Sequence, residues 1–157
     1  MKLADAITLE SPRALIPVPA SPPGPRQDEW LSDVSLAYSS RGGVASGDEI
    51  ARMLRPHVTQ PLSTLARWVV GRAVVSFSWR EQTLVPLFQF NREDMSIRSG
   101  VREAMTELAP AFNEWESAAW FVEPNDWLGG AAPADVLADD LQALLEAARA
   151  DRFVAMG

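Results

Sequence analysis

The positions of proline and glycine constrain this chain more than any other feature of its sequence. Half of its twelve prolines lie between Pro12 and Pro25. Proline fixes φ and lacks a backbone N–H, so that stretch favours neither a helix nor a central strand. We therefore expect residues 1–27 to form a disordered tail. The other six prolines, with glycine pairs at 42–43 and 129–130, divide the remaining sequence into short elements.

Apolar residues recur at helical spacing in three segments of the first half. The predicted helices cover residues 28–38, 48–55 and 61–70. Ser46 followed by Glu49 is a capping-box pattern before the second helix, and Gly71 is a natural end for the third. The two short helices of residues 46–70 are predicted to form a helix-turn-helix.

The apolar period then changes from 3.6 to 2, which favours strands. Residues 73–79 and 83–90 predict a β-hairpin, with Pro86 on its outer edge. The later helices are predicted at residues 100–108, 110–122, 133–137 and from Asp139 or Asp140 to 152. The expected fold is mainly α: residues 28–90 form a helix-turn-helix module with a β-hairpin, and residues 91–157 form an all-helical domain.

Charge is distributed unevenly along a chain of net charge −7. Residues 29–90 carry six Arg against five acidic residues, whereas residues 91–157 carry five Arg against thirteen. This asymmetry indicates different partners for the two parts, and the acidic part is unsuited to phosphate backbones. No apolar run is long enough for a membrane span, so we expect a cytoplasmic protein without membrane contact.

Residue types exclude most catalytic and metal-binding arrangements. The chain has no cysteine and a single histidine, His57, which excludes thiolate sites and histidine-rich metal sites. Gly129 and Gly130 are too few for a phosphate loop, and no Ser/His/Asp set is plausible. We expect no catalytic residues, no cofactor and no metal.

A DNA-binding surface is predicted on the helix of residues 61–70. Ser63, Thr64 and Arg67 are expected to point outward, and Arg72 follows the helix. Such side chains can contact phosphates and base edges. The same spacing equally fits a packed helical pair that serves as a dimer interface, so both interpretations stay open.

Residues 124–137 combine a helix end, a two-glycine turn and a proline at a helix start. Their pattern, Pro-Asn-x-x-Leu-Gly-Gly-x-x-Pro-x-x-Val-Leu, resembles the core motif of the toxin-binding domain of the Xre/MbcA/ParS antitoxins. Residues 86–90 and 147–153 are also similar to that family, and the resemblance covers roughly residues 45–157. The short helical pair with a hairpin departs from a five-helix Xre domain.

The resemblance implies an antitoxin of a type II toxin–antitoxin system. Members of this family neutralise RES-domain toxins that consume NAD, and their C-terminal region enters or covers the toxin active site. Many also repress their own operon through an N-terminal helix-turn-helix. The implied partners are thus a RES-domain toxin and operator DNA, with the chain itself a homodimer or part of a larger complex.

The predicted toxin-binding residues lie around the glycine turn and along the last helix. They are Trp120, Asn125, Trp127, Leu128, Arg149, Arg152, Phe153, Val154, Met156 and Gly157. Phe153 and Met156 are expected to fill a cleft of the toxin, since buried aromatic and Arg anchors dominate many interfaces. The alternative is that residues 153–157 dock onto their own domain.

Two other functions fit the same sequence. One is a stand-alone DNA-binding transcriptional regulator that uses its helical domain only to dimerise. The other is a helical interaction protein with neither a toxin partner nor a DNA site.

Overall fold

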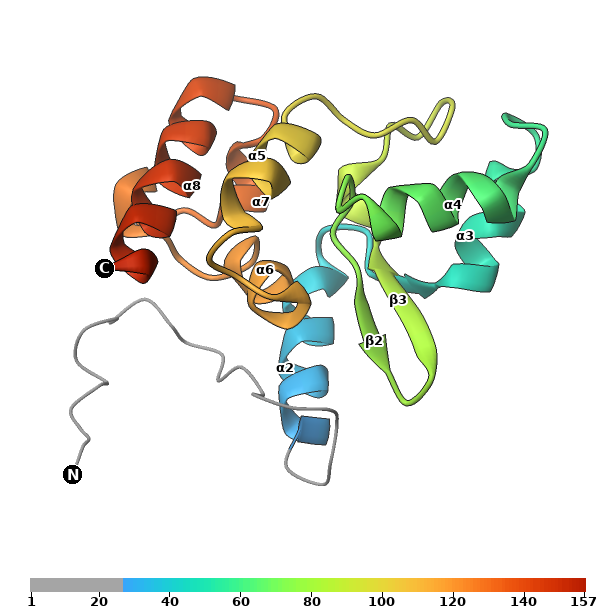
Figure 1. Cartoon of the computed structure of the whole chain (residues 1–157), viewed down its shortest axis with the longest axis horizontal. Helices are drawn as coiled ribbons and strands as arrows, with labels where there is room; N and C mark the ends of the chain where they lie inside the picture. Colours follow the sequence, from blue (N-terminus) through green and yellow to red (C-terminus); the bar gives the residue numbers. More distant parts are fainter. Residues whose placement is uncertain (1–26) are drawn as a thin grey trace.

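The computed structural model describes residues 27–157, and the tail predicted for residues 1–27 lies outside this range except for Gln27. The described chain is mainly helical with one small sheet, as the sequence predicts at that level (Figure 1). Within residues 27–157, no helix has the length and apolar character that a membrane crossing requires.

The first half contains the three predicted helices and one strand that the sequence did not predict. The elements are α2 (Gln27–Ser39), β1 (Val44–Ser46), α3 (Gly47–Leu54) and α4 (Pro61–Val70). Ser46 caps α3 by the predicted capping box: its side chain accepts from the Glu49 N–H, and the Glu49 carboxylate accepts from the Ser46 N–H. Gly71 ends α4 as expected. The helix-turn-helix role of α3 and α4 stays a prediction.

The sheet has three antiparallel strands in the order β1-β3-β2, with β2 (Phe77–Trp79) and β3 (Gln82–Pro86) forming the predicted hairpin. The prediction that Pro86 lies on an outer edge is wrong, because Pro86 ends the central strand opposite Val44. β2 pairs with β3 only as far as Phe77 opposite Leu84. Proline is therefore tolerated where the second partner strand has already ended.

The buried side chain of Gln89 replaces the missing strand contacts beside Pro86. Its amide nitrogen donates to the carbonyl oxygens of Pro86 at 2.8 Å and Val75 at 2.9 Å. Its amide oxygen accepts from the Val75 N–H at 2.7 Å. A fully buried amide is stable here because both of its polar ends are bonded.

The second half is helical. It contains α5 (Val101–Leu108), α6 (Glu114–Trp120), α7 (Pro133–Val136) and α8 (Leu141–Met156), with 3-10 turns η1 (Leu87–Gln89) and η2 (Asp126–Leu128). The helix predicted over residues 110–122 is shorter, because Asn113 caps it in a capping box with Glu116. The last helix is longer than predicted and continues through Phe153 to Met156.

Two apolar clusters hold these elements together. The smaller cluster lies between α3, α4 and the sheet and includes Ile50, Leu65 and Val85. The larger cluster joins α2 and β2 to α5, α6 and α8, so residues on both sides of the predicted boundary after residue 90 share one core. Within it, the Tyr38 hydroxyl donates to the Ala118 carbonyl oxygen at 2.6 Å. Burial raises the pKa of Tyr38 well above its ordinary value, which keeps this donor protonated.

Candidate functional site

The glycine turn after α6 folds as the sequence predicts. The Asn125 side chain accepts from the Trp127 N–H at 2.9 Å, and the Asn125 carbonyl oxygen accepts from the Gly130 N–H at 2.8 Å. Gly129 and Gly130 both have positive φ, at 67° and 91°, which glycine adopts without strain. Pro133 then occupies the first turn of α7. We call residues 124–133 the glycine corner.

A buried carboxylate on α8 fixes the glycine corner in place. One oxygen of Asp151 accepts from the Trp120 indole N–H at 2.8 Å and from the Asn125 amide at 2.9 Å. The other oxygen accepts from the Trp127 indole N–H at 2.9 Å. Asp151 is only 2% exposed, so these bonds replace much of the hydration that a carboxylate loses on burial. Two donors from the corner and one from the end of α6 thereby meet one residue of α8.

Sequence reasoning missed Asp151, although a signal was present. Asp151 follows Leu144, Ala147 and Ala148 at helical spacing, which places an acidic side chain on the apolar stripe of α8. A charged residue in such a stripe indicates a buried partner, and the nearby corner supplies indole and amide donors.

The structure separates the predicted toxin-binding residues into interior and surface groups. Trp120 and Asn125 are buried, so the expectation that they contact a partner directly is wrong: they bind Asp151 instead. Leu128 is half-buried against the larger core cluster. Asn125 and Leu128 belong to the corner and Trp120 supports it from α6, but none of the three forms its outer surface.

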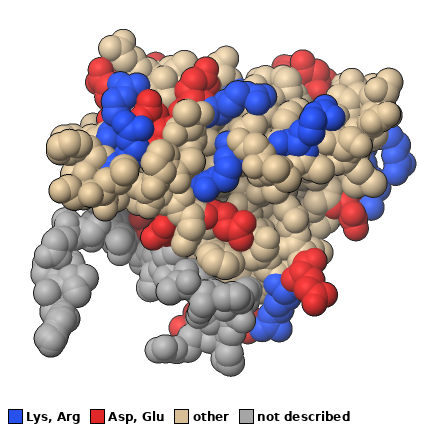
Figure 2. Space-filling view, viewed as in Figure 1, with Lys and Arg blue, Asp and Glu red and all other residues tan. Residues whose placement is uncertain are grey.

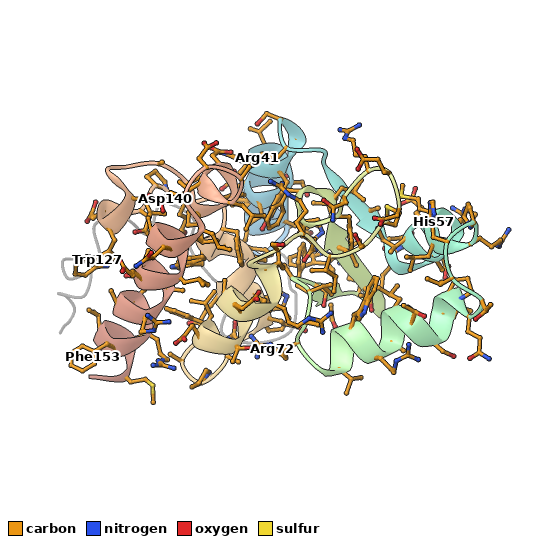
Figure 3. The ribbon with its side chains drawn as sticks, turned by 90° about the horizontal axis from the view of Figure 1, so that it is seen from above. Arg41, His57, Arg72, Trp127, Asp140 and Phe153 are labelled. Atoms are coloured by element: carbon orange, nitrogen blue, oxygen red, sulfur yellow. The ribbon has the colours of Figure 1, made fainter. Side chains whose placement is uncertain are left out.

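Four apolar side chains remain exposed around the corner and the last turn of α8. We call them the terminal apolar surface: Trp127, Phe153, Val154 and Met156, whose exposed fractions are 55%, 78%, 59% and 63%. Figure 3 shows Trp127 and Phe153 at the same end of the molecule, both pointing away from it. The predicted alternative, docking of this segment onto its own helices, is not what residues 27–157 show.

Two of the predicted arginines flank this surface and share one partner. Arg149 and Arg152 form ion pairs with Glu107 of α5 at 3.2 and 3.0 Å. Both side chains keep part of their surface exposed. Gly157, the last predicted residue, is exposed and follows α8.

The predicted DNA-binding residues do not form one surface. Ser63 and Arg67 are exposed, but Thr64 is buried, so its predicted outward position is wrong. Arg72 points toward the second half, where its guanidinium donates to the Phe112 carbonyl oxygen at 3.0 Å and the Ser117 hydroxyl at 3.1 Å. Figure 2 shows basic side chains across α8, α5 and α4 with acidic ones between them, which is mixed charge and no continuous basic stripe on this face.

A groove lies between η1, α3 and α7. Its volume is about 890 Å³, and Arg41, Arg98 and His57 contribute polar groups to it. Arg41 binds Asp135 through both carboxylate oxygens at 2.7 and 2.8 Å, and Arg98 donates to the Phe88 carbonyl oxygen at 2.8 Å. The hydrogen bond from Arg41 lowers the pKa of Asp135. These guanidiniums therefore already have protein partners.

Within residues 27–157, no cluster of three or more His, Cys, Asp or Glu side chains is arranged to hold a metal ion. Comparison with protein-family models, with curated proteins and with solved structures found no match to this chain.

Proposed function

We propose that this protein is an antitoxin that binds and blocks a RES-domain, NAD-consuming toxin through the terminal apolar surface. The observation that carries the proposal is the exposure of Phe153, Val154 and Met156 on a helix end that Asp151 anchors one turn earlier. The resemblance of residues 124–137 to the antitoxin motif supplies the class of partner.

Blocking follows from burial of this helix end in a cleft of the toxin. Phe153 and Met156 lose apolar surface to the partner, at about 25 cal/mol per Å² removed from water. The rigid corner holds Trp127 beside them, so little conformational entropy is lost on binding. Arg149 and Arg152 lie at the rim, where guanidiniums meet the polar groups that bind the nucleotide. Occupation of the cleft then excludes NAD.

We do not extend the proposal to operator DNA. Two of the four residues predicted to contact DNA are not positioned to do so. Thr64 is buried, and Arg72 is hydrogen-bonded to Phe112 and Ser117.

The first test is whether an adjacent reading frame encodes a RES-domain protein, and the second is co-expression of the chain with that protein. We expect the pair to co-purify and the chain to rescue growth. Phe153→Asp is expected to weaken the complex by roughly 100-fold, as for loss of an aromatic anchor. Leu36→Asp is the matched control, because Leu36 is 74% exposed on the distant helix α2.

Deletion of residues 153–157 separates folding from binding. The deletion removes one exposed turn beyond Asp151, so we expect the fold to persist and growth rescue to be lost. Circular dichroism monitors the fold in the same samples. Three outcomes would contradict the proposal. The first is growth rescue that survives the deletion, and the second is an equal loss of toxin affinity in Leu36→Asp and Phe153→Asp. The third is the absence of a RES-domain gene beside this one.

A further inference from the structure

The groove between η1, α3 and α7 has an apolar lining that the toxin-binding proposal does not use. Met53 of α3 lines it and is 40% exposed, and Leu87 of η1 is half-buried there. Phe90 and Met95 also line it, although both are largely buried. Its volume of about 890 Å³ lies within the range of small-molecule sites, which is roughly 300–1,000 Å³. An apolar body of drug-like size can therefore be covered here.

The loop of residues 91–96 contributes to this lining and is held in shape by its own hydrogen bonds. The Asn91 N–H donates to the Ser96 carbonyl oxygen at 2.8 Å, and the Asn91 side-chain amide donates to the Ser96 hydroxyl at 2.8 Å. Met95 has a φ of 59°, which is strained for a residue other than glycine and persists only where the surrounding structure fixes it. A lining that is already ordered loses little conformational entropy when a ligand binds.

Positive charge is in excess around the groove. The charged residues of its lining are Arg41, Arg92 and Arg98 against Glu93 and Asp135, in a chain whose net charge is −7. Arg41 and Asp135 bind each other. Two guanidiniums therefore remain against one carboxylate, which favours an anionic ligand.

Both of these guanidiniums have N–H groups available for a ligand. Arg98 donates to the Phe88 carbonyl oxygen through Nη1 alone, so its Nη2 and Nε have no partner within residues 27–157. Arg92 is exposed and forms no hydrogen bond or ion pair with another described residue. His57 adds an imidazole to the same groove. Guanidinium N–H groups match the geometry of carboxylates and phosphates, to which they donate two parallel hydrogen bonds.

We propose that this groove binds a small organic anion with an apolar body. The body covers Met53, Leu87 and Met95, and its carboxylate or phosphate group accepts from Arg92 and Arg98. Both parts of the ligand are needed. A wholly apolar molecule would take water from the guanidiniums without replacing its hydrogen bonds, and an inorganic anion would leave the apolar lining in contact with water.

The proposed anion site is separate from the terminal apolar surface. Figure 3 shows Arg41 and His57, which both line the groove, away from the end of the molecule that carries Trp127 and Phe153. Anion binding therefore goes beyond toxin blocking, and each proposal can fail its own test without affecting the other.

The test is titration of the full chain with the fluorescent probe anilinonaphthalene sulfonate, which joins an apolar ring system to one negative charge. We expect saturable binding, and at least roughly tenfold weaker binding of the neutral analogue phenylnaphthylamine, because it offers the guanidiniums no anionic acceptor. Octanoate and octyl phosphate should displace the probe, and the tighter of the two identifies the head group.

Two matched pairs of variants locate the bound probe. Arg92→Gln should raise the dissociation constant by roughly fivefold, whereas Arg67→Gln, at an exposed arginine of α4 outside the groove, should leave it unchanged. Met53→Gln should also weaken binding, whereas Met156→Gln on the terminal apolar surface should not. Circular dichroism confirms that all four variants are folded.

Any of four results overturns the proposal. They are equal affinity for the charged and the neutral probe, failure of both octanoate and octyl phosphate to displace the probe, equal effects of Arg92→Gln and Arg67→Gln, and loss of binding in Met156→Gln in place of Met53→Gln. The last result would place the probe on the terminal apolar surface.

Discussion

Asp151 connects the glycine corner to the exposed end of α8. Its two oxygens accept from Trp120, Asn125 and Trp127, which belong to three successive parts of the chain. All three donors are neutral N–H groups. Removing the acceptor takes away the Asp151 partner of the buried Trp120 and Asn125 donors, which costs more than an ordinary hydrogen bond contributes.

Asp151→Ala is expected to lower the free energy of unfolding by about 3 kcal/mol. Asp151→Asn keeps one acceptor oxygen and should fall between this variant and the wild type. Urea unfolding followed by tryptophan fluorescence measures both. Asp139→Ala, at an exposed position, should change stability by less than about 0.5 kcal/mol. Equal effects of the Asp151 and Asp139 variants would show that the buried network does not stabilise the fold.

The ion pair between Arg41 and Asp135 joins the end of α2 to α7. The Arg41 guanidinium binds both oxygens of Asp135 and also donates to the Ala37 carbonyl oxygen. The pKa of Asp135 is lowered, first by the hydrogen bond from Arg41 and then by its charge. About half of the Asp135 side chain is exposed (52%), so solvent reduces the contribution of the pair to stability.

Asp135→Asn should therefore destabilise the protein by less than about 1 kcal/mol at neutral pH. Because the folded pKa lies below the unfolded value of about 3.9, the stabilisation is complete above that pH and disappears as the pH falls through the folded value. Urea titrations of wild type and variant across acidic pH should converge. Asp139→Asn is the control for changes in stability at acidic pH that do not involve the ion pair. A wild-type advantage that persists at the lowest pH would contradict this assignment.

At the scale of elements, local signals in the sequence predict the helices well and the sheet in part. The Ser46 capping box, the Gly71 end of α4 and the Pro133 start of α7 are local, and each is confirmed. Strand β1 was missed because three residues are too few to show an alternation, and it forms only by pairing with β3. Contacts between distant residues determine such elements.

In the candidate site, too, features set by neighbouring residues could be predicted from the sequence, and features set by distant contacts could not. The glycine corner could be predicted from Asn125, Gly129 and Gly130, because the turn is determined by neighbouring residues. The sequence could not predict the burial of Thr64 or the inward position of Arg72, because both depend on which elements pack against α4 and the following loop. The helical period of apolar residues identifies the buried face of a helix, but it does not show how much of the opposite face other elements cover.

The β2–β3 turn is unusual for its residue types. Arg80 and Glu81 have φ of 50° and 66°, and they connect the paired residues Trp79 and Gln82. Two successive residues with positive φ form a type I′ turn, which asparagine and glycine favour. Neither native residue is favoured there, so this turn stores a small amount of strain.

Glu81→Gly should therefore stabilise the hairpin, since glycine adopts positive φ without a clash of its Cβ. We expect the free energy of unfolding to rise by roughly 0.5–1 kcal/mol, measured by urea unfolding. Glu81→Ala removes the same carboxylate but keeps a Cβ, and it should give no comparable gain. If alanine stabilises as much as glycine, charge and not backbone strain is responsible.

At the scale of the whole molecule, one core joins the two predicted modules. The larger cluster contains Trp30 and Phe77 from the first half and Leu108 and Leu144 from the second. The smaller cluster around α3 and α4 also extends past residue 90 to Met95. Since apolar burial is the dominant favourable term in folding, segments that share a core should unfold together.

Tyr38→Phe tests this coupling, because Tyr38 lies on α2 and donates to Ala118 of α6 across the larger cluster. The variant keeps the ring and loses one buried hydrogen bond, so the free energy of unfolding should fall by about 1 kcal/mol. The separate 19F resonances of Trp68 in α4 and of Trp127 at the glycine corner, in protein labelled with 5-fluorotryptophan, should report the same midpoint in urea. Tyr38→Phe should shift both midpoints equally. A shift confined to one reporter would mean that the modules unfold separately, and that α4 can open while the terminal apolar surface stays formed.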